Sequence, residues 1–116
     1  MRSKPVYNAL SDIHRNIGLA CGFVAGLTFD AFCADERTLY AVTRCLEITS
    51  EASRKLSTEL KERHPDIPWT NIATAGNVYR HEYEELTSAI VWDTVQSHLV
   101  ALRTAVEQEI ARFTNE

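Results

Sequence analysis

Apolar residues recur at every third or fourth position along most of the chain, the spacing of an α-helix that buries one face. The first run predicts a helix over residues 5–26. Thr28 can cap a short helix that ends near residue 33, because its hydroxyl can accept a hydrogen bond from a first-turn N–H. Asp35 can cap a second long helix, predicted over residues 36–63.

The second half of the chain predicts two more helices. Pro65 and Pro68 stop the preceding helix, since proline lacks the backbone N–H that a helix needs. Pro68 also suits the first turn of the next helix, which would end close to Tyr83. Thr87 or Ser88 can cap the helix that follows.

The last predicted helix carries one continuous apolar stripe: Val91, Val95, Leu99, Leu102, Val106, Ile110 and Phe113. Glu107, Glu109 and Arg112 are expected to face solvent. Neither an alternating strand pattern nor an internal repeat is present in the sequence. We therefore expect an all-α, up-and-down bundle of four long helices plus a short connecting helix, forming one domain over residues 1–116.

Three glycines at fourfold spacing mark the second half of the first helix. Gly18, Gly22 and Gly26 lie in an apolar run over residues 17–29, shorter than the roughly 20 residues that a bilayer requires. Each glycine costs a helix up to about 1 kcal/mol relative to alanine, so three on one face indicate the close approach of another helix. We expect this half-helix to be buried nearly all round. Its second contact is either with its own bundle or, as we predict, with a partner subunit in a homodimer.

Composition and charge narrow the possible partners. The chain has 116 residues, 45% apolar and 24% charged, as in an ordinary globular protein. Its net charge of −4 repels nucleic acid overall, so any RNA contact would need a local basic cleft. The chain has an odd number of cysteines, Cys21, Cys33 and Cys45, and none of them forms a Cys-x-x-Cys pair. This favours free thiols in a reducing, cytoplasmic setting.

A polar cluster stands out in the stretch from Gly76 to Tyr83. Asn77 and His81 are one helical turn apart, and Arg80 lies beside them. One explanation is structural, because Arg and His suit the negative end of a helix dipole. The other explanation is a chemical site. The four histidines of the chain lack the tight spacing of a zinc site, so we expect neither a metal nor another cofactor.

The sequence around this cluster resembles the HepT-type toxin family of the HEPN superfamily. The resemblance spans most of the chain and rests on these segments: Asp35-Glu36-Arg37-Thr38, Leu46-Glu47-Ile48, Ile67-Pro68-Trp69, Ile72-Ala73, Asn77, His81, Tyr83 and Ile90-Val91-Trp92-Asp93-Thr94-Val95-Gln96.

The resemblance implies metal-independent RNA cleavage through a pattern of Arg, about four residues, His, any residue and Tyr. His81 and Tyr83 match the family His and Tyr, and Asn77 matches the Asn that commonly follows the Arg. The position expected to hold the Arg is Gly76, which puts the nuclease activity in doubt. Arg80 is a possible substitute. A single histidine offers acid or base but not both at once, so this reading favours a dimer in which two His81 residues line one cleft.

The resemblance also implies a partner, a minimal nucleotidyltransferase antitoxin of the MntA type. That enzyme blocks the family toxins by attaching AMP to the motif tyrosine, here Tyr83, which could instead be a structural residue. Three interpretations therefore follow from the sequence. They are a ribonuclease toxin, an inactive HEPN module that binds the nucleotidyltransferase and accepts AMP, and a helical dimer with another role.

Overall fold

The computed structural model describes residues 4–81 and 84–115, and no side chain within residues 77–86. Its elements in chain order are α1 (Lys4–Val24), α2 (Phe29–Ala34), α3 (Glu36–Ser53), α4 (Thr58–Glu62), α5 (Trp69–His81), α6 (Glu84–Asp93), the π-helical turn η1 (Thr94–His98) and α7 (Leu99–Thr114). These residues contain no strand, so the expected all-α bundle is confirmed. The additional helices arise where the predicted ones are interrupted.

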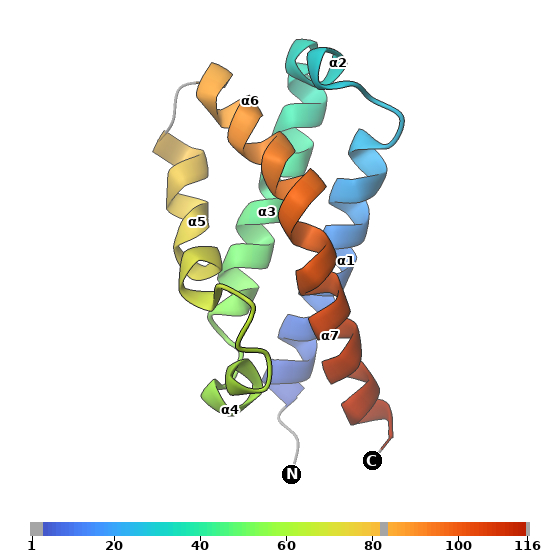
Figure 1. Cartoon of the computed structure of the whole chain (residues 1–116), viewed down its shortest axis with the longest axis vertical. Helices are drawn as coiled ribbons and strands as arrows, with labels where there is room; N and C mark the ends of the chain where they lie inside the picture. The colour runs from blue at the N-terminus through green and yellow to red at the C-terminus, as the bar shows by residue number, and fades with distance from the viewer. Residues whose placement is uncertain (1–3, 82–83, 116) are drawn as a thin grey trace.

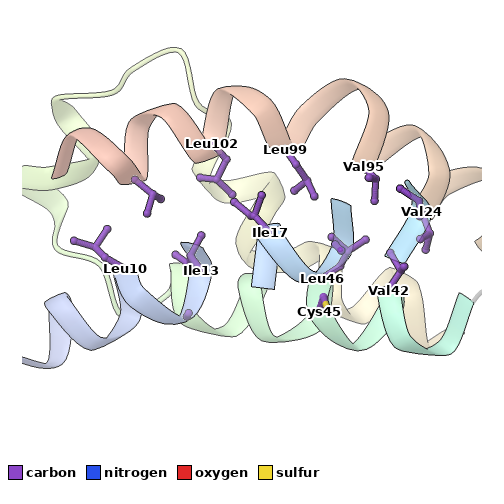
Figure 2. Packing of buried hydrophobic residues seen from close by; sticks show 14 of the residues in the cluster. Leu10, Ile13, Ile17, Val24, Val42, Cys45, Leu46, Val95, Leu99 and Leu102 are labelled. Atoms are coloured by element: carbon purple, nitrogen blue, oxygen red, sulfur yellow. The ribbon is translucent and has the colours of Figure 1, made fainter. Parts of the chain in front are cut away.

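The body of the bundle consists of α1, α3 and the segment from α6 to α7 (Figure 1). α1 packs against both α3 and α7, whereas α5 lies on the flank of α3. Figure 2 shows apolar side chains from these elements meeting in the centre: Leu10, Ile13, Ile17, Val24, Val42, Cys45, Leu46, Val95, Leu99 and Leu102. Burying one such aliphatic side chain contributes about 1.5–3 kcal/mol, so this core holds the helices in place.

Val91, Val95 and Val106 of the predicted apolar stripe are buried, as expected. One residue that was expected to face solvent is buried as well. Glu109 is only 2% exposed. Its carboxylate accepts hydrogen bonds from Arg63, which lies between α4 and α5, and a buried carboxylate requires such a partner. The prediction of a solvent-facing Glu109 was wrong because helical spacing cannot show that a basic residue far along the chain covers it.

The predicted helix over residues 36–63 is two helices. α3 ends at Ser53, and α4 begins after Ser57, whose hydroxyl accepts a hydrogen bond from the N–H of Leu60 at 3.2 Å. Leu56 and Leu60 are both buried on either side of this cap. The break therefore turns the chain while keeping Leu56 and Leu60 inside. Because both residues fit the helical spacing, the sequence pattern did not reveal the break.

The glycines of α1 divide into two kinds. Gly26 follows the end of the helix at Val24 and adopts φ 80°, a left-handed conformation that suits glycine at a helix C-terminus. A Cβ at Gly18 would be 3.7 Å from the guanidinium of Arg103 on α7, whereas a Cβ at Gly22 would have no described atom within 4 Å. Ile17, Ala20 and Val24 are buried in the core but Phe23 is 43% exposed, so the chain's own bundle does not give this half-helix the nearly all-round burial that was expected. No described helix combines the length and apolar content that a membrane crossing requires.

Two of the predicted helix caps, Thr28 and Asp35, are confirmed, and the cap predicted at Thr87 or Ser88 is wrong. Thr28 accepts a hydrogen bond from the N–H of Ala31 at 3.1 Å, and Asp35 accepts one from Thr38 at 3.1 Å. Thr87 and Ser88 begin no helix. They are buried inside α6, since that helix already starts three residues before Thr87.

Candidate functional site

Three of the sequence-predicted site residues, Asn77, Arg80 and His81, lie at the end of α5. The helix is continuous up to His81, so Asn77 and His81 occupy positions one turn apart on one stripe. Gly76 and Arg80 occupy the neighbouring stripe, also one turn apart. The side chains of Asn77, Arg80 and His81 lie outside the described residues, as does Tyr83 altogether. The structure therefore gives the register of the first three on the helix.

The beginning of α5 is anchored to the segment that precedes it. The indole Nε1–H of Trp69 is donated to the carbonyl oxygens of His64 at 3.0 Å and Lys61 at 3.2 Å. The imidazole Nε2 of His64 lies 2.7 Å from a carboxylate oxygen of Glu109 on α7. These contacts join α5 to α7 through the connection between α4 and α5, so they help to set where the predicted site residues stand.

The middle of α5 is bonded to α3 by two side chains of that helix. The hydroxyl of Ser50, which is 2% exposed, donates to the carbonyl oxygen of Ala73 at 3.1 Å. The same oxygen of Ser50 accepts from the N–H of Gly76 at 3.3 Å. Arg54, one turn further along α3, also donates to the Ala73 carbonyl oxygen, at 3.1 Å. α3 therefore holds α5 about one and a half turns before His81.

Gly76 lies at this contact between the two helices. A Cβ at position 76 would be 3.3 Å from Oγ and 3.6 Å from Cβ of Ser50. The first distance is tight for a Cβ beside another side chain, so a side chain at position 76 would require Ser50 to move by a few tenths of an ångström. Position 76 thus faces α3, and the structure gives a physical reason why glycine stands where the resemblance expects arginine.

A cavity of about 330 Å³ opens beside α5, between that helix and the segment from η1 to α7. Residues of α3, of α5 and its preceding connection, and of η1 and α7 line it: Leu46, Thr49, Ser50, Asp66, Ile67, Pro68, Asn71, Ile72, Ala75, Thr94, Ser97, His98, Leu99, Ala101 and Leu102. The lining is mostly apolar with polar groups interspersed, as is common for ligand pockets.

The π-helical turn contributes a polar group to the cavity wall. Single π-helical turns are rare and occur frequently at functional sites. Here Asp93 accepts a hydrogen bond from Ser97 at 3.2 Å and lies 3.3 Å from Nε2 of His98. The His98 and Asp93 side chains are 64% and 67% exposed, so their pairing adds little stability but leaves both groups accessible.

Sequence reasoning missed Ser50 and Arg54 as residues that position α5. Neither belongs to a motif, and both depend on a contact between helices that periodicity cannot predict. One signal was present. Thr49, Ser50 and Ser53 place hydroxyl groups in the buried region of α3, and buried hydroxyls require hydrogen-bond partners.

Within the described ranges, no group of three or more His, Cys, Asp or Glu side chains could hold a metal ion.

Comparison with known proteins gives consistent matches. The pattern of the family described as ribonuclease HepT-like matches residues 13–109. The chain is 33% identical over 99 residues to “Probable ribonuclease HepT” of Thermococcus cleftensis, which covers 85% of this chain and 90% of that protein. It is 34% identical over 95 residues to “Putative RNase MJ0127” of Methanocaldococcus jannaschii, covering 82% and 78% respectively. No solved structure gives a significant match.

Proposed function

Because the chain belongs to the HepT-like ribonuclease family, we propose that it is a metal-independent endoribonuclease, the toxin of a toxin–antitoxin pair. One observation carries the proposal. The family match includes the last turns of α5, where Asn77, Arg80 and His81 stand within two adjacent stripes of one helix. Its substrate, RNA, and its proposed ATP-using antitoxin suit a cytoplasmic protein.

His81 is the proposed acid–base group of the cleavage reaction. Imidazole titrates near neutral pH, so it can take the proton of a ribose 2′-hydroxyl or return one to the leaving 5′-oxygen. Arg80 would neutralise the negative charge that develops on the phosphoryl oxygens, and Asn77 would hydrogen-bond the phosphate or orient His81. Arg80 stands one turn after Gly76 on the same stripe of α5, which supports it as the cation of a site whose usual arginine position holds glycine.

The two proton transfers of this reaction call for two histidines or for one that changes its protonation state during the reaction. A two-fold homodimer supplies the second His81 if both copies line one groove. The chain presents a face that suits such an assembly. In the second half of α1 the outer positions include Gly22, whose Cβ position meets no described atom within 4 Å, and the 43% exposed Phe23, so part of this face lies uncovered by its own bundle.

Replacing Gly22 by Arg should convert the protein from a dimer to a monomer at micromolar concentration. A Cβ at this position would meet no described atom of its own chain within 4 Å, and arginine favours a helix more than glycine does. The monomer should therefore stay folded, while the arginine side chain prevents a second copy from packing against this face. Sedimentation equilibrium measures the change in mass.

Asn8→Arg is the matched control for this change, because Asn8 is an exposed residue in the polar first half of the same helix. It should leave the dimer intact. A wild-type protein that sediments as a monomer would refute the proposed assembly, and so would a Gly22→Arg dimer of unchanged affinity.

Tyr83 is the proposed site of regulation. Incubation with the cognate nucleotidyltransferase, ATP and magnesium should raise the mass of the protein by one or more AMP units, all on the peptide that contains Tyr83. An AMP group adds negative charge and bulk beside the catalytic histidine, where both would oppose entry of RNA phosphate. Tyr83→Phe should abolish the mass gain, and Tyr79→Phe serves as the matched control that should retain it. Modification that survives in Tyr83→Phe would place the acceptor elsewhere.

A second candidate function is favoured by Gly76. A chain without the family arginine could keep the fold and the tyrosine while losing cleavage, and would then act as a binding partner and AMP acceptor of the nucleotidyltransferase. The two functions differ in one measurement. Cleavage of RNA by the unmodified protein, lost in His81→Ala, supports the nuclease, whereas AMP transfer without any cleavage supports the inactive module.

A further inference from the structure

The contact between Ser50 and Gly76 carries consequences beyond the packing of two helices. Ser50 is 2% exposed and makes both of its hydrogen bonds across the contact, donating to Ala73 at 3.1 Å and accepting from Gly76 at 3.3 Å. A buried hydroxyl that is satisfied in this way costs free energy to displace, because both backbone partners would lose a bond. Its oxygen therefore holds the position that a side chain at residue 76 would approach.

The same contact controls what residue can stand at position 76. The Cβ of any L-residue would begin 3.3 Å from the Ser50 oxygen and 3.6 Å from its Cβ. Arg54 adds a further hydrogen bond between the two helices, to the Ala73 carbonyl one turn before position 76, so a long side chain there would begin between bonded helices. Glycine avoids both problems, since it adds no atom to the contact.

We propose that Ser50 is the positioning residue that opposes a side chain at residue 76, so that an arginine can act there only when the Ser50 hydroxyl is removed. The proposal rests on the ribonuclease function, since it identifies position 76 as the place of a phosphate-binding arginine. Along a helix with a rise of 1.5 Å and a turn of about 100° per residue, position 76 stands about 7.5 Å below His81 along the axis and about 140° around it, so an arginine there would have to extend along the helix surface to reach the same phosphate. Removal of the Ser50 side chain frees the first part of that path.

Stability measures the contact independently of cleavage. Gly76→Arg alone should lower the thermal midpoint by roughly 5–10 °C, because overpacking displaces the Ser50 side chain or pushes the helices apart. Ser50→Gly alone should lower it by a few degrees through lost hydrogen bonds and glycine in a helix. The double variant should melt no lower than Ser50→Gly, a strong departure from additivity. Thr49→Gly combined with Gly76→Arg is the matched control and should show additive losses, because Thr49 bonds its own helix at Cys45.

RNA cleavage without added metal measures the catalytic consequence. Ser50→Gly/Gly76→Arg should cleave about tenfold faster than the wild type, or more, since one added charge-stabilising group is worth about that factor at least. Gly76→Arg alone should not exceed the wild type. His81→Ala introduced into the double variant should remove the gain.

Each result decides the matter. Additive thermal shifts, or equal acceleration by Gly76→Arg with Ser50 present, would overturn the proposal. A wild type that cleaves through His81 beside a double variant that is no faster would also overturn it while leaving the ribonuclease function standing. If the thermal shifts are coupled but no variant cleaves RNA, the ribonuclease function fails, and the exclusion of side chains by Ser50 is upheld by the stability data.

Discussion

Replacing His81 by alanine should lower RNA cleavage by about 10²–10⁴-fold, the contribution of a positioned general acid or base. Arg80→Ala should lower it by about 10²–10³-fold, because negative charge on the phosphoryl oxygens would go uncompensated in the transition state. Arg80→Lys should recover part of the loss, since it keeps the charge without the planar fork of donors. Initial rates of cleavage of a fluorescent RNA, measured under single-turnover conditions, give these ratios.

His14→Ala is the matched control for these variants. His14 is an exposed histidine that pairs with Glu107 at 3.1 Å on the surface formed by α1 and α7, so its loss should leave cleavage unchanged. Chelators should also leave the rate unchanged, because the proposed mechanism gives every role to side chains. Undiminished cleavage by His81→Ala, or cleavage that stops with a chelator, would assign the chemistry to other groups or to a contaminating nuclease.

The fold could be predicted because its main cause is the burial of apolar helix faces, and apolar residues recur at helical spacing along the sequence. Val91, Val95 and Val106 were placed inside by this rule, and the structure buries all three. The caps at Thr28 and Asp35 were also predicted correctly, since each involves residues only three apart and so depends on local sequence alone.

The errors arise where helical spacing allows more than one structure or where a distant residue decides the outcome. Glu109 is buried because Arg63, 46 residues earlier, reaches it. The interruption after Ser53 keeps Leu56 inside while turning the chain, and nothing in the spacing requires it. Thr87 has the chemistry of a cap but stands within α6, since a threonine can equally be a buried helical residue.

The candidate site was less predictable than the fold. The resemblance supplied His81, Asn77 and Tyr83, whereas geometry alone gave only a polar cluster near the end of a helix. Ser50 could not be recognised, because its role is defined by a partner on another helix 26 residues later. The family pattern marks Gly76 as a departure, and only the packing against α3 gives that departure a physical reason.

Glu109 also makes a strong prediction about stability. Burial raises the pKa of its carboxyl, but hydrogen bonds and positive charge from Arg63 and His64 outweigh burial and hold the pKa below the ordinary value. A carboxyl with a lower pKa in the folded than in the unfolded state stabilises the fold above its unfolded pKa of about 4.3. That stabilisation is lost as the pH falls through the folded pKa.

Replacing Arg63 by methionine should therefore destabilise the protein by roughly 2–4 kcal/mol at pH 7, because a buried carboxylate loses its bidentate partner. The distances of 2.6 and 3.2 Å from the Arg63 nitrogens to the carboxylate oxygens identify that partner. Glu109→Gln should cost less, since the Arg63 side chain is 29% exposed and can turn to water and to Glu59 at 3.4 Å. Urea denaturation with an unchanged m-value measures each loss.

The dependence on pH separates this charge effect from lost packing. As the pH falls towards 4, the carboxylate of the Arg63→Met protein should take up a proton first, because burial without Arg63 raises its pKa, and the difference from the wild type should shrink. Arg112→Met is the matched control. Its Nε is 3.7 Å from the Glu109 carboxylate and its side chain is 49% exposed, so the loss should stay below about 1 kcal/mol at either pH. Equal losses for the two arginines, or an Arg63→Met loss that does not change with pH, would mean that the stability does not depend on the charge of Arg63 beside Glu109.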